Sequence, residues 1–304
     1  PSPDVLRYVD IVPADTWLER VEVTDSLASD RYSHERLRDI LRDETARTAR
    51  HDVKVELLGV DAALDVVPAG GLGVLLHALF APAPLDESAL LDVHDEAYVD
   101  AIRNGKPRWQ AEAQGFEWCE ALWSAALMSS AGVVSAALHA LQHRAVSGSL
   151  SSGLHHARFD TGAGCCTFNG LALAARATVA AGAERVLLLD LDAHGGGGTW
   201  SLLSSDPAFT SLDICTFDYD RFSSRRWKNV LVTNPQAYVA TIERELCSLD
   251  GAFDLCLYNA GMDPCELSDQ GMPGVKTSAL AARERLVFDW CRARALPVAF
   301  VLAG

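Results

Sequence analysis

One stretch, RVLLLDLDAHGGGGT at residues 185–199, constrains the fold more than any other part of the sequence. Its segment Val186 to Asp190 is predicted to be a buried β-strand, because so short an apolar run suits a parallel strand covered on both faces better than a helix. Four consecutive glycines, 195–198, follow where the chain would leave the sheet. The stretch therefore predicts an α/β protein in which a central strand ends in a polar, glycine-rich loop.

Three side chains at the end of this strand have the spacing of a metal site. Asp190, Asp192 and His194 alternate at every second position, so on an extended backbone they project to one side. Ligands of open α/β sheets bind beyond the carboxyl ends of the strands, where these residues would lie. Aspartate oxygens and a histidine nitrogen suit one divalent ion, and zinc is the first candidate. The alternative is a polar strand end capped by a flexible loop, and this segment alone does not decide between the two.

Two other segments favour the metal site. Residues 254–258 (DLCLY) predict a second buried strand, which places Asp263 in a loop just past its end. Upstream, His155 and His156 are adjacent in a glycine-rich loop before a predicted helix. A hydrolytic zinc site needs three protein ligands, an open position for water and a base beside it, and the histidine pair could supply the base. The three ligands could be Asp192, His194 and Asp263.

The rest of the sequence alternates strand and helix patterns, which predicts a mostly parallel central sheet with helices on both faces. Further strands are expected at residues 6–12, 90–94, 212–218 and 297–302. Helices are expected at residues 33–50, 95–104, 120–144, 167–181, 238–249 and 279–294, and a loop at residues 105–115. No repeat or low-complexity linker divides the sequence, so we expect a single domain over residues 1–304.

Charge and cysteine usage limit the partners and the compartment. The sequence carries 41 acidic and 26 basic residues, a net charge of −15. Nucleic acid binding needs a basic face, so we expect no direct nucleic acid ligand, and the acidic surface favours cationic peptides or amines. Eight cysteines without a C-x-x-C pair predict reduced thiols and a cytoplasmic location. We expect no membrane span, because no apolar run reaches the required length, and the oligomeric state stays open.

Three motifs, in order along the chain, carry a resemblance to a known family. They are GLHHARFDTGAGCCTFNGLALA, VLLLDLDAHGGGGT and LYNAGMD. Together they resemble the zinc-dependent histone deacetylase family, within the arginase and deacetylase superfamily, and the details DLDAH and YNAGMD look most like its class IV branch. The similarity extends from about Tyr32 to the end of the sequence. It implies the arginase/deacetylase fold, an α/β domain of the kind that the strand and helix patterns predict.

The resemblance also implies two cation sites. Zinc would be held by Asp192, His194 and Asp263. A monovalent cation, usually potassium in this family, would lie behind the zinc, held by carbonyl and side-chain oxygens around two strands. Its ligands would be Asp190, Asp192, His194, Thr216 and Phe217.

Catalytic roles follow from the same resemblance. His156 would be the general base that later gives its proton to the leaving lysine amine, and His155 would assist electrostatically. Asp190 would orient His155 by holding one ring nitrogen, since such hydrogen bonds fix the tautomer of a histidine. Gly164 and Cys165 align with the loop that lines the substrate channel of the family, and a cysteine in place of a usual aromatic residue would widen that channel.

One departure from the family concerns the partner of His156. The family usually has His or Gln at the position of Gly195, and Asp or Asn at that of Gly197, where the side chain would orient the general base. Both positions are glycine here. Loss of such a hydrogen bond costs about 10- to 100-fold in activity. A water, or a residue from elsewhere in the chain, could take its place, and the sequence does not show which.

A second departure lies at Gly304. Members of the family place a catalytic tyrosine after the glycines that close the last strand, where it polarises the scissile carbonyl. This sequence ends in VLAG, where that motif would continue, and we expect the C-terminal end of the domain to be incomplete. Without the tyrosine, one missing oxyanion donor would cost on the order of 3 kcal/mol of transition-state stabilisation.

Three functions are compatible with these residues. The leading hypothesis is a zinc-dependent amidohydrolase that removes acyl groups from acyl-lysine, including long-chain fatty acyl groups. A small-amine deacetylase of the acetylpolyamine type is the first alternative, and a catalytically impaired protein that binds acyl-lysine through its metal is the second. An arginase-like enzyme with two manganese ions is disfavoured, because it would need an aspartate where Gly196 stands.

Overall fold

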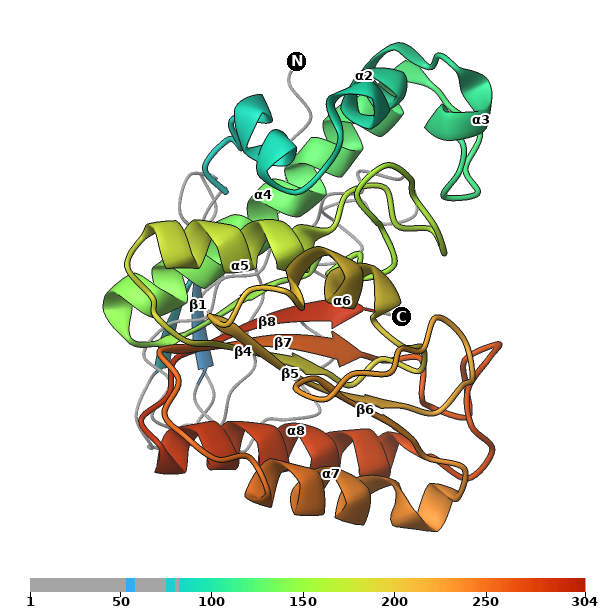
Figure 1. Cartoon of the computed structure of the whole chain (residues 1–304). Helices are drawn as coiled ribbons and strands as arrows, with labels where there is room; N and C mark the ends of the chain where they lie inside the picture. Colours follow the sequence, from blue (N-terminus) through green and yellow to red (C-terminus); the bar gives the residue numbers. More distant parts are fainter. Residues whose placement is uncertain (1–52, 58–74, 80–81, 304) are drawn as a thin grey trace.

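The computed structural model describes residues 53–57, 75–79 and 82–303, the first two segments as backbone only (Figure 1). These two segments form β1 (Val53–Leu57) and β2 (Leu75–Leu79), which pair in parallel as a small separate sheet. The strand expected at residues 6–12 and the helix expected at residues 33–50 lie outside the described residues.

The main sheet has six strands in the order β3-β8-β7-β4-β5-β6, and every pair is parallel. This confirms the predicted parallel α/β sheet. The central strand β4 lies between β7 and β5, so the carboxyl ends of all three meet at one edge. The bounds are β3 (Val146–Ser149), β4 (Val186–Asp190), β5 (Phe209–Cys215), β6 (Lys228–Leu231), β7 (Leu255–Gly261) and β8 (Val298–Ala303).

Helices cover both faces of this sheet (Figure 1). On one face lie α4 (Glu120–His143), α5 (Gly170–Ala180) and α6 (Gly197–Leu203). On the other lie α7 (Tyr238–Cys247) and α8 (Thr277–Ala293). The remaining helical elements are η1 (Glu87–Asp92), α2 (Glu96–Asn104), α3 (Arg108–Ala111) and η2 (Pro235–Ala237).

Strand β4 shows why a continuous apolar run was needed at its position. Leu187 and Leu189 belong to the core that includes α7 and α8, whereas Val186 and Leu188 belong to the core that includes α4 and α5. Alternate side chains of a strand point to opposite faces, so both faces of β4 require apolar residues. Each such buried side chain contributes roughly 1.5–3 kcal/mol. Both cores therefore hold this strand, and with it the polar residues that follow it.

Helix α4 is long and apolar enough to cross a membrane, by length and composition only. This corrects the expectation that no apolar stretch reaches that length. Half of the apolar stretch of α4 is buried inside the molecule, and the helix packs against α5 and the strands β3 and β8. A core helix of a globular domain has the same composition.

Most predicted elements are present within one to three residues of their expected bounds, but one is wrong. Residues 90–94 were expected to form a strand, whereas residues 87–92 form the 3₁₀ helix η1. Asp86 caps this helix by accepting a hydrogen bond from the backbone N–H of Ser88 at 3.0 Å. Short apolar runs suit either structure, and the capping aspartate decides here in favour of the helix.

Other differences affect the loops near the site. The strand expected at residues 212–218 is β5, which begins earlier and ends at Cys215, so Thr216 and Phe217 lie beyond it. The expected loop at residues 105–115 contains the short helix α3. Strands β3 and β6 and helix α6 were not predicted. They are short or glycine-rich, and β6 is only partly buried, so their sequences carry little periodic signal.

A buried arginine ties α8 to the ends of two strands. Arg283 is fully buried, and its Nη1 donates to the carbonyl of Leu191 at 3.0 Å and to that of Gly261 at 2.6 Å. These carbonyls immediately follow β4 and close β7. Its charge is balanced by Glu284, with Nε donating to the carboxylate at 2.8 Å. The ends of β4 and β7 are thus held in position by one side chain from helix α8.

Replacing this arginine should be costly. We expect Arg283→Met to lower the free energy of unfolding by about 3–5 kcal/mol, because it removes a buried charge and leaves its partners unpaired. Urea denaturation followed by circular dichroism measures the change. The matched control is Arg285→Met, an exposed position on the same helix, where a change within about 0.5 kcal/mol is expected. Equal stabilities of the two variants would contradict this account.

Candidate functional site

The three expected metal ligands converge at the carboxyl edge of the sheet. Asp192 and His194 follow β4, and Asp263 lies two residues after the end of the neighbouring β7. The Nδ1 atom of His194 is 3.1 Å from Asp192 Oδ1 and 3.0 Å from Asp263 Oδ2. One ligand atom from each residue lies within 4.8 Å of the other two. Both aspartates are buried and the histidine is partly exposed, so the cluster is open on one side.

The backbone holds these ligands in place. The N–H of Ala193 donates to Asp263 Oδ1 at 2.9 Å, and the N–H of His194 donates to Asp192 Oδ1 at 3.0 Å. Gly261 allows the two loops to approach, because a Cβ at this position would lie 2.3 Å from the Cα of Asp192. The ligand geometry therefore depends on hydrogen bonds and on a glycine as well as on strand order.

The donor set fits a divalent cation such as zinc. Two carboxylate oxygens and one imidazole nitrogen are the donor types that zinc accepts, with room for a further ligand on the open side. Hydrogen bonds to Asp192 and then to Asp263 raise the pKa of His194 to about 10, in spite of partial burial. Two carboxylates on one imidazole thus make this position strongly favourable for positive charge.

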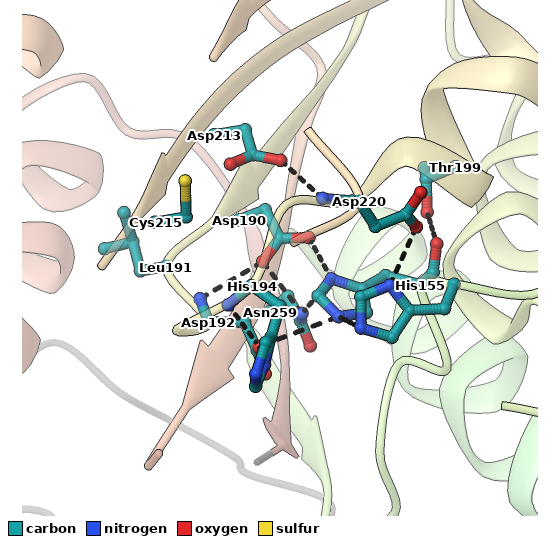
Figure 2. A network of polar contacts seen from close by, with 12 residues as sticks. His155, Asp190, Leu191, Asp192, His194, Thr199, Asp213, Cys215, Asp220 and Asn259 are labelled. Atoms are coloured by element: carbon teal, nitrogen blue, oxygen red, sulfur yellow. Dashed lines mark hydrogen bonds and ion pairs between the residues drawn. The ribbon is translucent and has the colours of Figure 1, made fainter. Parts of the chain in front are cut away.

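The histidine pair lies beside this cluster. The Nδ1 atom of His155 is 2.8 Å from Asp190 Oδ2, as expected from the resemblance, and its Nε2 is 3.1 Å from the Nε2 of His156. Both rings are buried. Figure 2 shows Asp190 and Asn259 gathered around the ring of His155. Asn259 donates to Asp190 Oδ1 at 2.9 Å.

The two histidines differ in their electrostatic environment. Burial lowers the pKa of His155, but the charges of Asp190 and Asp192 outweigh burial and raise that pKa to about 10. For His156, burial and then the positive charge of His155 lower the pKa, and Asp220 only partly opposes them. Opposite pKa shifts in adjacent groups separate a cationic from a neutral partner. The environment therefore favours the charged form of His155 and the neutral form of His156.

The loop that carries the pair is fixed from two sides. Asn169, at the start of α5, donates to the carbonyl of Ala157 at 3.0 Å and to Thr199 Oγ1 at 3.1 Å. The N–H of Thr199 donates to the carbonyl of His155 at 3.0 Å. A Cβ at Gly198 would lie 2.5 Å from the same carbonyl, so only glycine lets α6 pack this closely.

The partner of His156 comes from a part of the chain that the sequence did not indicate. Asp220, in the loop after β5, places Oδ2 at 2.8 Å from the Nδ1 of His156. The two residues are 64 positions apart. Of the two possibilities left open for replacing a side chain at Gly197, the structure therefore supports a residue from elsewhere. The only sequence signal was an acidic residue in the loop after a strand, which is too common to identify it.

The residues expected to hold a monovalent cation are also brought together. The N–H groups of Thr216 and Phe217 donate to the carbonyl of Ala193 at 2.9 and 2.7 Å, which joins this loop to the segment with Asp192 and His194. Thr216 Oγ1 is buried and has no hydrogen-bond partner in the described part of the chain. An unpaired buried oxygen suits a cation, since buried polar atoms otherwise find partners.

Small and aromatic residues surround the histidines. Gly164 lies against His156, because a Cβ there would be 2.5 Å from its Cδ2 atom, and the neighbouring Cys165 is exposed. The ring of Tyr219 is 5.1 Å from that of His156, and the ring of Phe217 is 5.4 Å from that of His194. Both aromatic residues are 43% exposed. Tyr219 was not expected at the site. Its ring lies edge-on beside the ring of His156.

Fold and site together are those of a hydrolase: a parallel sheet with a candidate metal-binding cluster and a histidine pair at its carboxyl edge. The sequence profile of the histone deacetylase domain matches residues 60–304. The chain belongs to the histone deacetylase family, which confirms the resemblance and places it among hydrolases that act on acyl amides. The class IV branch stays a prediction.

Individual relatives agree with this. An uncharacterized protein of Picosynechococcus is 30% identical over 74% of this chain and 78% of its own length. The acetylpolyamine amidohydrolase of Mycoplana ramosa is 29% identical over 43% of this chain and 49% of its own length. The crystal structure of a histone deacetylase homologue from Aquifex aeolicus superposes with a TM-score of 0.62 at 16% identity, covering 76% of this chain and 68% of that one. The last comparison confirms the fold.

Removing one ligand should abolish metal binding. We expect the purified protein to bind about one divalent ion per chain and His194→Ala to bind almost none, because two carboxylates alone leave the site one protein donor short. Inductively coupled plasma mass spectrometry after dialysis measures the content. His143→Ala, an exposed histidine at the end of α4, is the control and should retain the metal. Equal metal content in both variants would place the ion elsewhere.

Proposed function

We propose that this chain is a zinc-dependent amidohydrolase that removes acyl groups from acyl-lysine side chains of proteins or peptides. The observation that carries the proposal is the convergence of Asp192, His194 and Asp263 at one point, with His156 beside them and buried. The ring centroids of His156 and His194 are 5.8 Å apart. Ligands and base are thus close enough to act on the same bound amide.

The base acts through one defined ring nitrogen. Zinc, when bound by the three ligands, supplies a Lewis acid that polarises the substrate carbonyl and acidifies a water. His156 is protonated on Nδ1, which donates to the carboxylate of Asp220. The unprotonated Nε2 then takes the proton of the attacking water. The same nitrogen then returns a proton to the departing lysine amine. His155, held by Asp190, contributes positive charge next to the developing oxyanion.

Two observations weigh against a catalytically impaired binding protein. Gly197 was an argument for impairment, because it leaves the general base without its usual partner. Asp220 supplies a carboxylate to the same ring nitrogen. The orienting bond of His155 is present as well. Both histidines therefore have the partners that an active site of this type requires.

Potassium is our proposal for the monovalent cation, held by Thr216 Oγ1 and by oxygens of Asp190, Asp192, His194 and Phe217. The unpaired hydroxyl of Thr216 supports it.

We also propose a cytoplasmic location. All eight cysteines of the sequence are free thiols in the structure, as is usual in a reducing compartment.

A small acylated amine is the second candidate substrate. It is favoured by the similarity to the acetylpolyamine amidohydrolase of Mycoplana ramosa. The net charge of −15 attracts cationic amines and lysine-rich peptides alike. The exposed Cys165 favours acyl groups longer than acetyl, because it does not fill the space that an aromatic side chain would occupy.

Turnover of a substrate series tests the function. Zinc-loaded protein should cleave acyl-lysine peptides, from acetyl to long-chain fatty acyl, faster than acetylated diamines, and His156→Ala should lose about 100- to 10,000-fold in kcat/KM. Liquid chromatography of the deacylated products measures the rates, with His143→Ala as the control that should retain them. Preference for the diamines would support the second candidate. Absence of turnover on both classes by protein with bound zinc would overturn the hydrolase proposal.

A further inference from the structure

We propose that Asp220 is the positioning residue of the general base, and that this chain carries the orienting carboxylate on the loop after β5 instead of on α6. Gly195 and Gly197 are glycines because that loop occupies the space where their side chains would stand. The catalytic consequence rests on the function proposed above. The placement of the carboxylate rests on contacts of the chain alone.

The carboxylate of Asp220 is held by both oxygens. Oδ2 accepts from the Nδ1 of His156 at 2.8 Å, and Oδ1 accepts from a guanidinium nitrogen of Arg158. The side chain of Asp220 is only 10% exposed. Arg158 also reaches the carbonyl of Gly197 at 3.3 Å. The carboxylate is thus fixed between the base and a cation, an arrangement that selects one ring tautomer of His156.

The backbone of this loop is shaped for that contact. Asp220 has φ 51°, in the left-handed region where few residues other than glycine, asparagine and aspartate are found. The N–H of Gly195 donates to the carbonyl of Tyr219 at 2.9 Å, which fastens the loop to the glycine run. A non-glycine residue in this conformation is a local cost, and such costs concentrate at functional sites.

A side chain at Gly195 or Gly197 would collide with the loop that carries Asp220. A Cβ at Gly197 would lie 2.4 Å from Oδ1 and 2.5 Å from the carbonyl oxygen of Asp220. A Cβ at Gly195 would lie 2.8 Å from the same carbonyl oxygen and 3.0 Å from the Cα of Arg221. A side chain at position 197 and the present loop therefore cannot coexist. One orienting carboxylate fits beside His156, and it comes from either α6 or the loop.

A simpler interpretation is that Asp220 only holds its loop in place through the ion pair with Arg158. The two roles differ in what a substitution changes. A residue that only holds the loop affects stability and depends on Arg158, whereas a positioning residue affects kcat through its contact with His156. Arg158→Met separates them, because it removes the ion pair and leaves the contact between Asp220 and His156.

Two single variants test the proposal. Asp220→Gly should lower kcat by about 10- to 100-fold with little change in KM, as loss of an orienting hydrogen bond does. Arg158→Met should keep a kcat well above that of Asp220→Gly, because it leaves the carboxylate beside His156. An unchanged kcat in Asp220→Gly, or Arg158→Met as slow as Asp220→Gly, would overturn the positioning role.

A measurement without turnover keeps the proposal separate from the proposed function. Nuclear magnetic resonance of zinc-loaded protein with ¹⁵N-labelled histidine should show a hydrogen-bonded Nδ1–H of His156, assigned by its absence in His156→Gln. We expect it to be lost in Asp220→Gly and retained in Arg158→Met. If it persists in Asp220→Gly, the positioning proposal is wrong whatever the activity. If it behaves as expected while no acyl substrate is cleaved, the positioning stands and the deacylase function fails.

Discussion

The structure around the site depends on placing several buried carboxyl groups close together. Asp190, Asp192, Asp213 and Asp263 all lie within the sheet or just beyond its carboxyl edge, and all are buried. Buried charges are costly unless each is paired or hydrogen-bonded. Asp213, next to Asp190 across the strand pair, shows the strain. Burial and then the charge of Asp190 raise the pKa of Asp213 well above its usual range, although the N–H of Gly196 donates to it at 2.7 Å.

The arrangement of these charges would stabilise a cation bound at the carboxyl edge of the sheet. The side chains of Asp190 and His155 form one ion pair and those of Asp220 and Arg158 another. The carboxylates of Asp192 and Asp263 both lie against the one ring of His194. A divalent ion held between those two carboxylates would remove the remaining repulsion. It would then stabilise the folded state as well as take part in the proposed reaction.

Sequence reasoning identified the parts of the site that follow a regular period. Strand β4 was predicted at its observed bounds, because its apolar run is buried from two sides. Asp192, His194 and Asp263 were then placed correctly from the rule that ligands gather where parallel strands end. Residues 90–94 failed, because a short apolar run does not distinguish a strand from a helical turn.

Asp220 could not be predicted in the same way, and the reason is physical. Its position depends on a loop that folds back over α6, on a left-handed backbone and on a contact 64 residues away. None of these leaves a period in the sequence. The glycines did leave a signal, but its meaning was ambiguous: a missing side chain at Gly197 suggests a lost function when that position is considered alone. Because the space is filled by Asp220, the same glycine is instead what allows the base to keep its partner.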